Sequence, residues 1–400
     1  MEYYIAILLA LAFFIYSISF RQLARAELTG PMYFVLTGMV VAAIFVAEFK
    51  INQPLDQLLP LVELTLAVVL FSDAAKTRLA ILKREFKYPL VLLFVALPLT
   101  FFATVLTGYV LFPEMGLLAL ALLAIILTPT DAALSKGILE AKAVPLNIRE
   151  AINVESGLND GLCVPIFLFL FLSWQLGSWQ DPMKMLEFMG REVGIALVVA
   201  VVITWVATRL IQYSASRHFF EKTSSPFLIL SLAIVNYAVA QGVGGSGFVA
   251  AFIAGLLFDH LYRPSKDMRL IEQSEHIAEF FSYLIWCLFG AYSYWQLLSI
   301  DLSWEKVIFA LIAATLVRVI PVLFSLMLFN GLNFKEKFTL AWFGPRGLAS
   351  IVFTLMVLDS ADGSLSELAT LTILTSVFIH GITTRPIANS FNKKSRAKKV

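Results

Sequence analysis

Long uninterrupted apolar runs are the feature that most restricts how this chain can fold. Two of them, residues 3–20 and 88–112, are long enough as helices to cross a hydrocarbon layer about 30 Å thick. Charged side chains make up 14% of the 400 residues, whereas soluble domains carry about a quarter. The sequence lacks the alternating segments of about ten residues that build outer-membrane barrels. It therefore predicts an all-α polytopic membrane protein.

Charged, proline and glycine residues separate the apolar runs and predict about thirteen transmembrane helices. The predicted ranges are 3–20, 31–48, 58–75, 88–112, 116–139, 149–173, 189–210, 225–242, 246–259, 275–295, 304–329, 336–358 and 366–386. With the N-terminus outside and the C-terminus cytoplasmic, most of the 30 Lys and Arg residues fall on the inner side, as the positive-inside rule requires. We predict a transmembrane domain over 1–386, a short basic cytoplasmic tail over 387–400 and no soluble regulatory domain.

Several ionisable residues lie inside the predicted helices. They are Asp73, Asp131, Glu155, Asp160, Arg318 and Arg346. A charge at this depth costs about 3 kcal/mol or more, so such residues are paired with one another or used in transport. We expect this set to include the functional site.

Two predicted helices are interrupted by proline. Asp131 ends the run Thr128-Pro129-Thr130-Asp131, and Arg346 lies in the Phe-Gly-Pro-Arg-Gly segment 343–347. Proline removes a backbone donor and clashes with the preceding turn, and broken helices inside a membrane either line a polar cavity or are buried in protein. Breaks at corresponding places in the two halves predict inverted repeats with two crossing discontinuous helices around a transport site. The alternative for the first break is a simple kink that Asp131 caps.

The helix predicted over 149–173 carries an oxygen-rich sector. Glu155 and Asn159 are four residues apart, as are Ser156 and Asp160, so all four face one side of the helix. Two carboxyls, an amide and a hydroxyl suit a hard cation and include no soft ligand for a transition metal.

This combination resembles the sodium/proton exchanger family of the cation:proton antiporter superfamily. The residues that carry the resemblance are Thr130, Asp131, Glu155, Ser156, Asn159 and Asp160. The resemblance spans the whole chain and its thirteen-helix pattern. The chain differs from many members in placing proline before the aspartate instead of after it.

The resemblance implies that Asp160 carries either a proton or a cation. It implies a monovalent-cation site at Asp160, Ser156 and Thr130, which Asp131 and Asn159 complete. In electrogenic relatives a further aspartate takes the place of Asn159.

Two arginines gain expected roles from the same resemblance. Arg318 is expected to form a supporting ion pair with Glu155, and Arg346 to be the charge at the second helix break. The ranges 88–173 and 304–386 are expected to form the core, while the remaining helices form a scaffold that also mediates homodimerisation.

The predicted function is secondary active exchange of Na⁺ or K⁺ for H⁺, electroneutral and one for one, by alternating access. A channel is disfavoured because no selectivity-filter segment occurs. A sodium-coupled symporter of a small organic anion remains as the alternative, since half-helix ends would also suit it. The chain lacks the Ser/His and HExxH patterns of hydrolases, so no enzyme activity is expected.

The expected partners are membrane lipid and a second copy of the chain, in a bacterial inner membrane. Nucleic acid is not expected, because the basic residues are spread over many short connections. Cys163 and Cys287 lack metal-ligand spacing. We expect no cofactor besides the transported Na⁺ or K⁺ and H⁺.

Overall fold

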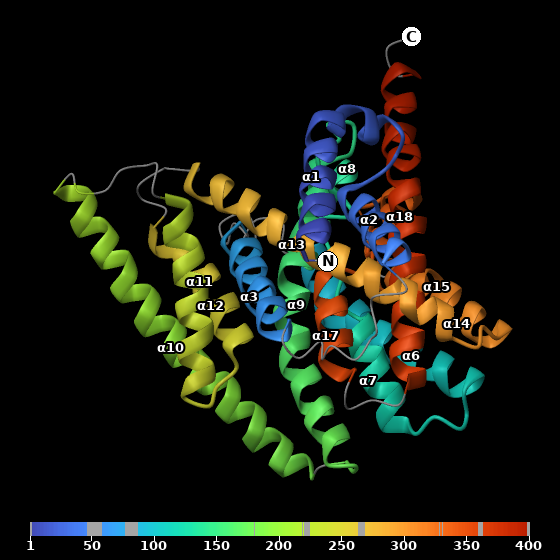
Figure 1. Ribbon diagram of the computed structural model, residues 1–400, viewed down its shortest axis with the longest axis horizontal. Helices are drawn as coiled ribbons and strands as arrows, with labels where there is room; N and C mark the ends of the chain where they lie inside the picture. The colour runs from blue at the N-terminus through green and yellow to red at the C-terminus, as the bar shows by residue number, and fades with distance from the viewer. Residues whose placement is uncertain are drawn as a thin grey trace. The chain divides into compact units, whose positions relative to one another are not determined.

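The computed structural model is helical, and no strand occurs among the residues that it describes (Figure 1). These residues are 2–45, 58–76, 87–179, 181–217, 219, 225–262, 269–327, 329, 331–358 and 363–397. Within them, 6 helices are long and apolar enough to cross a membrane. The predicted all-α fold is confirmed, while the number of membrane crossings stays a prediction.

The chain divides into two compact units. The first comprises Met1–Gln57, Tyr88–Ser156 and Tyr283–Val400, and the second comprises Leu58–Lys87 and Gly157–Ser282. Helices α9 (Leu146–Gln175) and α13 (Arg269–Ser299) contribute to both units, and the boundary at Lys87 also falls on the first residue of α5.

The other elements of the first unit are α1 (Glu2–Arg25), α2 (Gly30–Ile44), α5 (Lys87–Val91), the π-helical turn η2 (Leu92–Ala96), α6 (Leu97–Leu111), α7 (Leu117–Leu127), α8 (Lys136–Leu139), α14 (Trp304–Ala314), α15 (Leu316–Met327), α16 (Phe334–Trp342), α17 (Leu348–Val357) and α18 (Gly363–Ala397). Three pairs of them, α7 with α8, α14 with α15 and α16 with α17, are the two parts of an interrupted helix. The π-helical turn precedes Pro98, which cannot donate to the carbonyl one turn back, a common cause of such local adjustments.

The second unit is organised around α12 (Gly247–Tyr262). This helix packs against α3 (Leu59–Lys76), α10 (Pro182–Ser216) and α11 (Ser225–Gly242). Its core includes the buried rings of Phe71 and Phe258.

Each predicted range overlaps a helix or an interrupted helix, with two informative differences. The range 304–329 is divided into α14 and α15 at Thr315, although no proline stands at that point. The last helix, α18, continues beyond 386 to Ala397 and so enters the range predicted as a tail. Residues 387–397 include neither glycine nor proline, the two residues that disfavour a helix most strongly.

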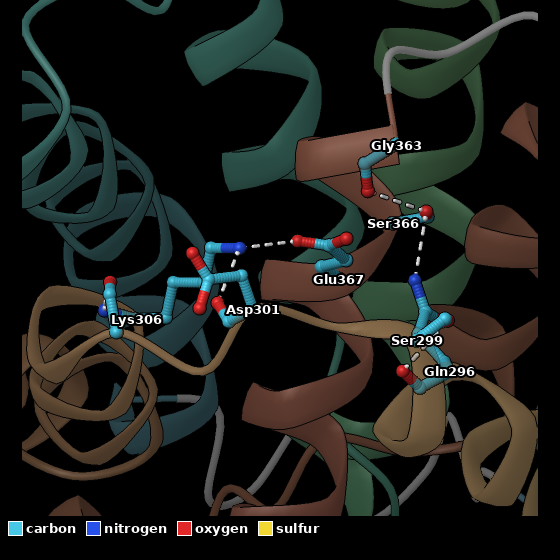
Figure 2. A network of polar contacts seen from close by, with 8 residues as sticks. Gln296, Ser299, Asp301, Lys306, Gly363, Ser366 and Glu367 are labelled. Carbon is cyan, nitrogen blue, oxygen red and sulfur yellow. Dashed lines mark hydrogen bonds and ion pairs between the residues drawn. The ribbon is translucent and has the colours of Figure 1, made fainter.

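In the first unit, α18 packs against α2, α7, α8, α14 and α17. Figure 2 shows how its beginning is fastened. Lys306 Nζ lies 3.0 Å from the carbonyl oxygen of Asp301 and 2.6 Å from the Glu367 carboxylate. Gln296 Nε2 donates to Ser366 Oγ at 3.2 Å. The start of α18 is therefore fixed to α14 and to the end of α13.

Helices α2 and α13 pack with their backbones in contact. A Cβ atom on Gly38 would lie 1.9 Å from the carbonyl oxygen of Cys287, and one on Gly290 would lie 2.1 Å from that of Val35. No side chain fits at either point. Small residues allow membrane helices this close approach, which adds van der Waals contact between them.

We predict that Gly38→Ala separates these helices and lowers stability by about 1–3 kcal/mol or more, because the added methyl meets backbone that cannot move aside. The control is Gly194→Ala on α10, where nothing lies within 4 Å of the added atom. The melting temperatures of both purified variants and the parent protein are compared in detergent. A Gly38→Ala protein with the same melting temperature as the Gly194→Ala control would contradict the close packing.

Candidate functional site

The first predicted break lies between α7 and α8. Helix α7 ends at Leu127, and α8 begins only at Lys136. Thr128 Oγ1 still donates back to the carbonyl oxygen of Ala124 at 2.7 Å, and Pro129, which cannot donate, follows at once. The chain then runs without helix to Ser135.

The second predicted break lies between α16 and α17. Helix α16 starts with a capping box between Asn333 and Glu336 and ends at Trp342. Five non-helical residues follow before α17 begins at Leu348. Both discontinuous helices therefore occur where their Pro-containing segments predicted them.

The two breaks meet at Asp131. Its backbone N–H donates to the carbonyl oxygen of Pro345 at 3.0 Å. Its carboxylate accepts the N–H of Ala133 at 2.7 Å and the N–H of Leu348, at the start of α17, at 3.4 Å. A Cβ atom on Gly347 would lie 2.0 Å from the Cβ atom of Asp131, so only glycine fits there. Asp131 does cap a helix end, but that end belongs to the opposite break.

Helix α9 is attached to the first break about three turns after it begins. Ser156 Oγ donates to the carbonyl oxygen of Thr130 at 2.8 Å, and both residues are buried. This bond occupies one of the carbonyls that the break releases from helical bonding. The structure thus brings together Thr130, Asp131 and Ser156 within the first unit.

Glu155 and Arg318 form a two-point ion pair. The Arg318 Nη1 and Nη2 atoms lie 2.8 and 2.9 Å from the two Glu155 carboxylate oxygens. The exposed fractions of these side chains are 3% and 1%, so water contributes little to their solvation. The same Nη2 atom lies 3.5 Å from the carbonyl oxygens of Leu340 and Phe343, at the C-terminal end of α16. A positive charge is favourable at such an end.

Arg346 is buried at the second break. Its Nη2 atom donates to the carbonyl oxygen of Ala313 at 3.0 Å. Ala313 precedes the interruption at Thr315, where the regular hydrogen-bond pattern between α14 and α15 fails. The interruption that the sequence did not predict therefore supplies an acceptor for this arginine.

Asn159 and Asp160 lie further along α9, in the second unit. Asn159 is fully buried and Asp160 is half-buried. Helix α9 is continuous over these positions, so Asp160 follows Ser156 by about one turn. The next residue, Gly161, packs under the ring of Phe252, since a Cβ atom there would lie 2.6 Å from it.

The structure also shows further ionisable residues that are buried or half-buried inside the helical units. The hydroxyl of Tyr237 donates to the Glu63 carboxylate at 2.7 Å. Asp259 in α12 and His380 in α18 are buried as well. Glu63 and Asp259 lie inside predicted apolar ranges, and an acidic residue in such a range is the sequence signal that could have identified them.

Comparison with known proteins identifies relatives along nearly the whole chain. Residues 8–390 match the family model described as "Sodium/hydrogen exchanger, transmembrane". A Na(+)/H(+) antiporter of Schizosaccharomyces pombe is 24% identical over 384 residues, which cover 86% of this chain and 81% of that protein. The K(+)/H(+) antiporter NhaP2 of Shewanella sp. (strain MR-4) is 24% identical over 335 residues, which cover 80% of this chain and 55% of that protein.

A solved structure shares the fold. The sodium proton antiporter MjNhaP1 from Methanocaldococcus jannaschii aligns with a TM-score of 0.76 at 18% identity, covering 95% of this chain and 100% of that chain. At this identity the likeness concerns the fold alone.

We predict that Arg318→Ala lowers the free energy of unfolding by about 3–5 kcal/mol, because it leaves the Glu155 charge buried without its cation. Replacing Glu155 by Gln in the same protein should restore part of the loss. Arg209→Ala, at an exposed position on α10, is the control. Thermal unfolding of the purified proteins in detergent measures the effect, and an Arg318→Ala protein as stable as the control would show that the pair contributes little.

Proposed function

The chain belongs to the sodium/hydrogen exchanger family, and from that premise we propose that it exchanges Na⁺ or K⁺ for H⁺ across a membrane by alternating access. The relatives named as Na(+)/H(+) and K(+)/H(+) antiporters support exchange with either cation. The observation that carries the proposal is the crossing of two helix breaks at Asp131. At such a crossing, backbone carbonyl oxygens that an unbroken helix would keep in its own hydrogen bonds become available to an ion inside the membrane.

Asp160 is the proposed carrier. A carboxylate must lose its proton before it can bind a cation, so binding of the two ions is mutually exclusive. Ser156 lies one turn earlier on the same helix and is bonded to Thr130. We assign Asp160, Ser156 and Thr130 as cation ligands, with Asn159 and Asp131 completing the site.

The organic-anion symporter is less well supported by this geometry. In such a transporter the positive N-terminal end of a half helix would bind the substrate's negative group. Here the N-terminus of α17 is already complemented by the Asp131 carboxylate. An anionic substrate would have to compete with a fixed negative charge at that point.

The remaining parts of the proposal concern the assembly. We propose an integral protein of a bacterial inner membrane, with the N-terminus outside, that functions as a homodimer. Its core comprises the helices over 88–173 and 304–386, and the other helices form the scaffold. No cofactor is assigned besides the transported ions.

We predict that Asp160→Asn abolishes exchange while the protein still folds, because an amide cannot alternate between proton and cation. The assay uses proteoliposomes with an imposed pH gradient and an internal pH-sensitive dye, challenged in turn with Na⁺, K⁺, Li⁺ and a small organic anion. Asp301→Asn, in the loop before α14, is the matched control, since only its backbone carbonyl contacts Lys306. Exchange retained by Asp160→Asn would exclude Asp160 as the carrier.

We further predict that exchange is electroneutral, one cation for one proton. Asp131 lies at a helix N-terminus and Glu155 is paired with Arg318, so we assign the exchange of proton for cation to Asp160 alone. A second titrating acid would move a net charge, which at about 100 mV involves about 2.3 kcal/mol and makes turnover voltage-sensitive.

The measurement is current on a solid-supported membrane, recorded with proton flux from the same preparation. Asp160→Asn membranes provide the background current. Sustained current in proportion to transport, shifting with the applied potential, would rule out one-for-one exchange.

A further inference from the structure

The peptide group between Pro345 and Arg346 is hydrogen-bonded on both sides. Its carbonyl oxygen accepts the N–H of Asp131 at 3.0 Å. Its N–H donates to the hydroxyl oxygen of Ser376, on α18, at 2.8 Å. Because a peptide group is planar, its C=O and N–H turn together. Ser376 therefore limits the direction in which Pro345 presents its oxygen to Asp131.

Ser376 itself is held by the next turn of its helix. The Nδ1 atom of His380 lies 2.8 Å from the carbonyl oxygen of Ser376 and 3.1 Å from its hydroxyl oxygen. A carbonyl oxygen can only accept, so this bond assigns the hydrogen to Nδ1. The exposed fractions of Ser376 and His380 are 0% and 1%, so water does not take over these bonds.

Helix α18 also contacts the other side of the second break. Trp342, the last residue of α16, donates its indole N–H to Thr383 Oγ1 at 2.9 Å. The hydroxyl hydrogen of Thr383 is directed to the carbonyl oxygen of Ile379 at 2.8 Å, which leaves the oxygen able to accept from Trp342. The indole ring lies against the His380 imidazole, with centroids 5.5 Å apart. The break is thus fixed to α18 at both of its ends.

We propose that Ser376 is a positioning residue for cation exchange, through the Pro345–Arg346 peptide that it orients against Asp131. The inference rests on the proposed function. Without the Ser376 hydroxyl, the Arg346 N–H is buried without this acceptor. The peptide then turns toward other acceptors, and Asp131 loses the carbonyl that holds its backbone. The oxygens at the crossing spread apart, and the cation binds more weakly.

The test is Ser376→Ala in the full-length protein, reconstituted in proteoliposomes with an imposed pH gradient. The concentrations of Na⁺ and of K⁺ that give half-maximal exchange should rise about five- to twentyfold, the equilibrium equivalent of one buried hydrogen bond lost. The control is Ser293→Ala, which removes a fully buried hydroxyl that donates to the carbonyl oxygen of Phe289 within α13. That variant should keep the parental half-saturating concentrations.

Ser376→Thr, which restores a hydroxyl at this position, should return the half-saturating concentrations toward those of the parent. Where Ser376→Ala does not accumulate, Ser376→Cys replaces it, since a thiol accepts hydrogen bonds only weakly. An alanine or cysteine variant with parental half-saturation, or one that loses only melting temperature and maximal rate, overturns the inference. Parent protein that exchanges no cation for protons overturns the proposed function instead, so the two failures are distinguishable.

Discussion

A helix that is interrupted inside a membrane exposes backbone N–H and C=O groups that lipid cannot satisfy. In this chain the two interruptions satisfy part of this requirement for each other. The N–H of Asp131 donates to the carbonyl oxygen of Pro345, and the Asp131 carboxylate accepts the first N–H of α17. Gly347 is the residue that lets the two segments approach, since a side chain there would occupy the position of Asp131. The roles proposed for Thr130, Asp131 and Ser156 depend on this crossing.

Charge balance around the crossing follows from the polarity of the half helices. A half helix carries partial positive charge at its N-terminus and partial negative charge at its C-terminus. The Asp131 carboxylate complements the start of α17, and the Arg318 guanidinium complements the end of α16 while it pairs with Glu155. Each of these three charges already has a fixed partner. In the proposed function these three charges stay fixed, and Asp160 is the charge that varies.

Whether a feature of this fold and site could be predicted from the sequence depends on how far apart in the chain the interacting residues lie. The two breaks could be predicted from Pro129 and from the Gly344-Pro345 pair, because proline disrupts the helical turn in which it lies. The pairing of Glu155 with Arg318, 163 residues apart, came from the family resemblance, since no local pattern encodes it. The interruption at Thr315 was not predicted, because no proline or glycine stands there. Tertiary contacts at that point include the Arg346 guanidinium, which binds the carbonyl of Ala313.

Ser376 shows why a residue important to a site can be invisible in a sequence. Serine and threonine inside apolar helices usually donate to a carbonyl one turn back, as Thr372 and Thr375 do in this helix. A hydroxyl also has lone pairs that accept, and whether they are used depends on which foreign N–H comes near. An extended break has N–H groups that no helix satisfies, so the same serine becomes a fixed acceptor when the break lies beside it. The pattern in α18 is ordinary, and the specificity arises from the irregular backbone of its neighbour.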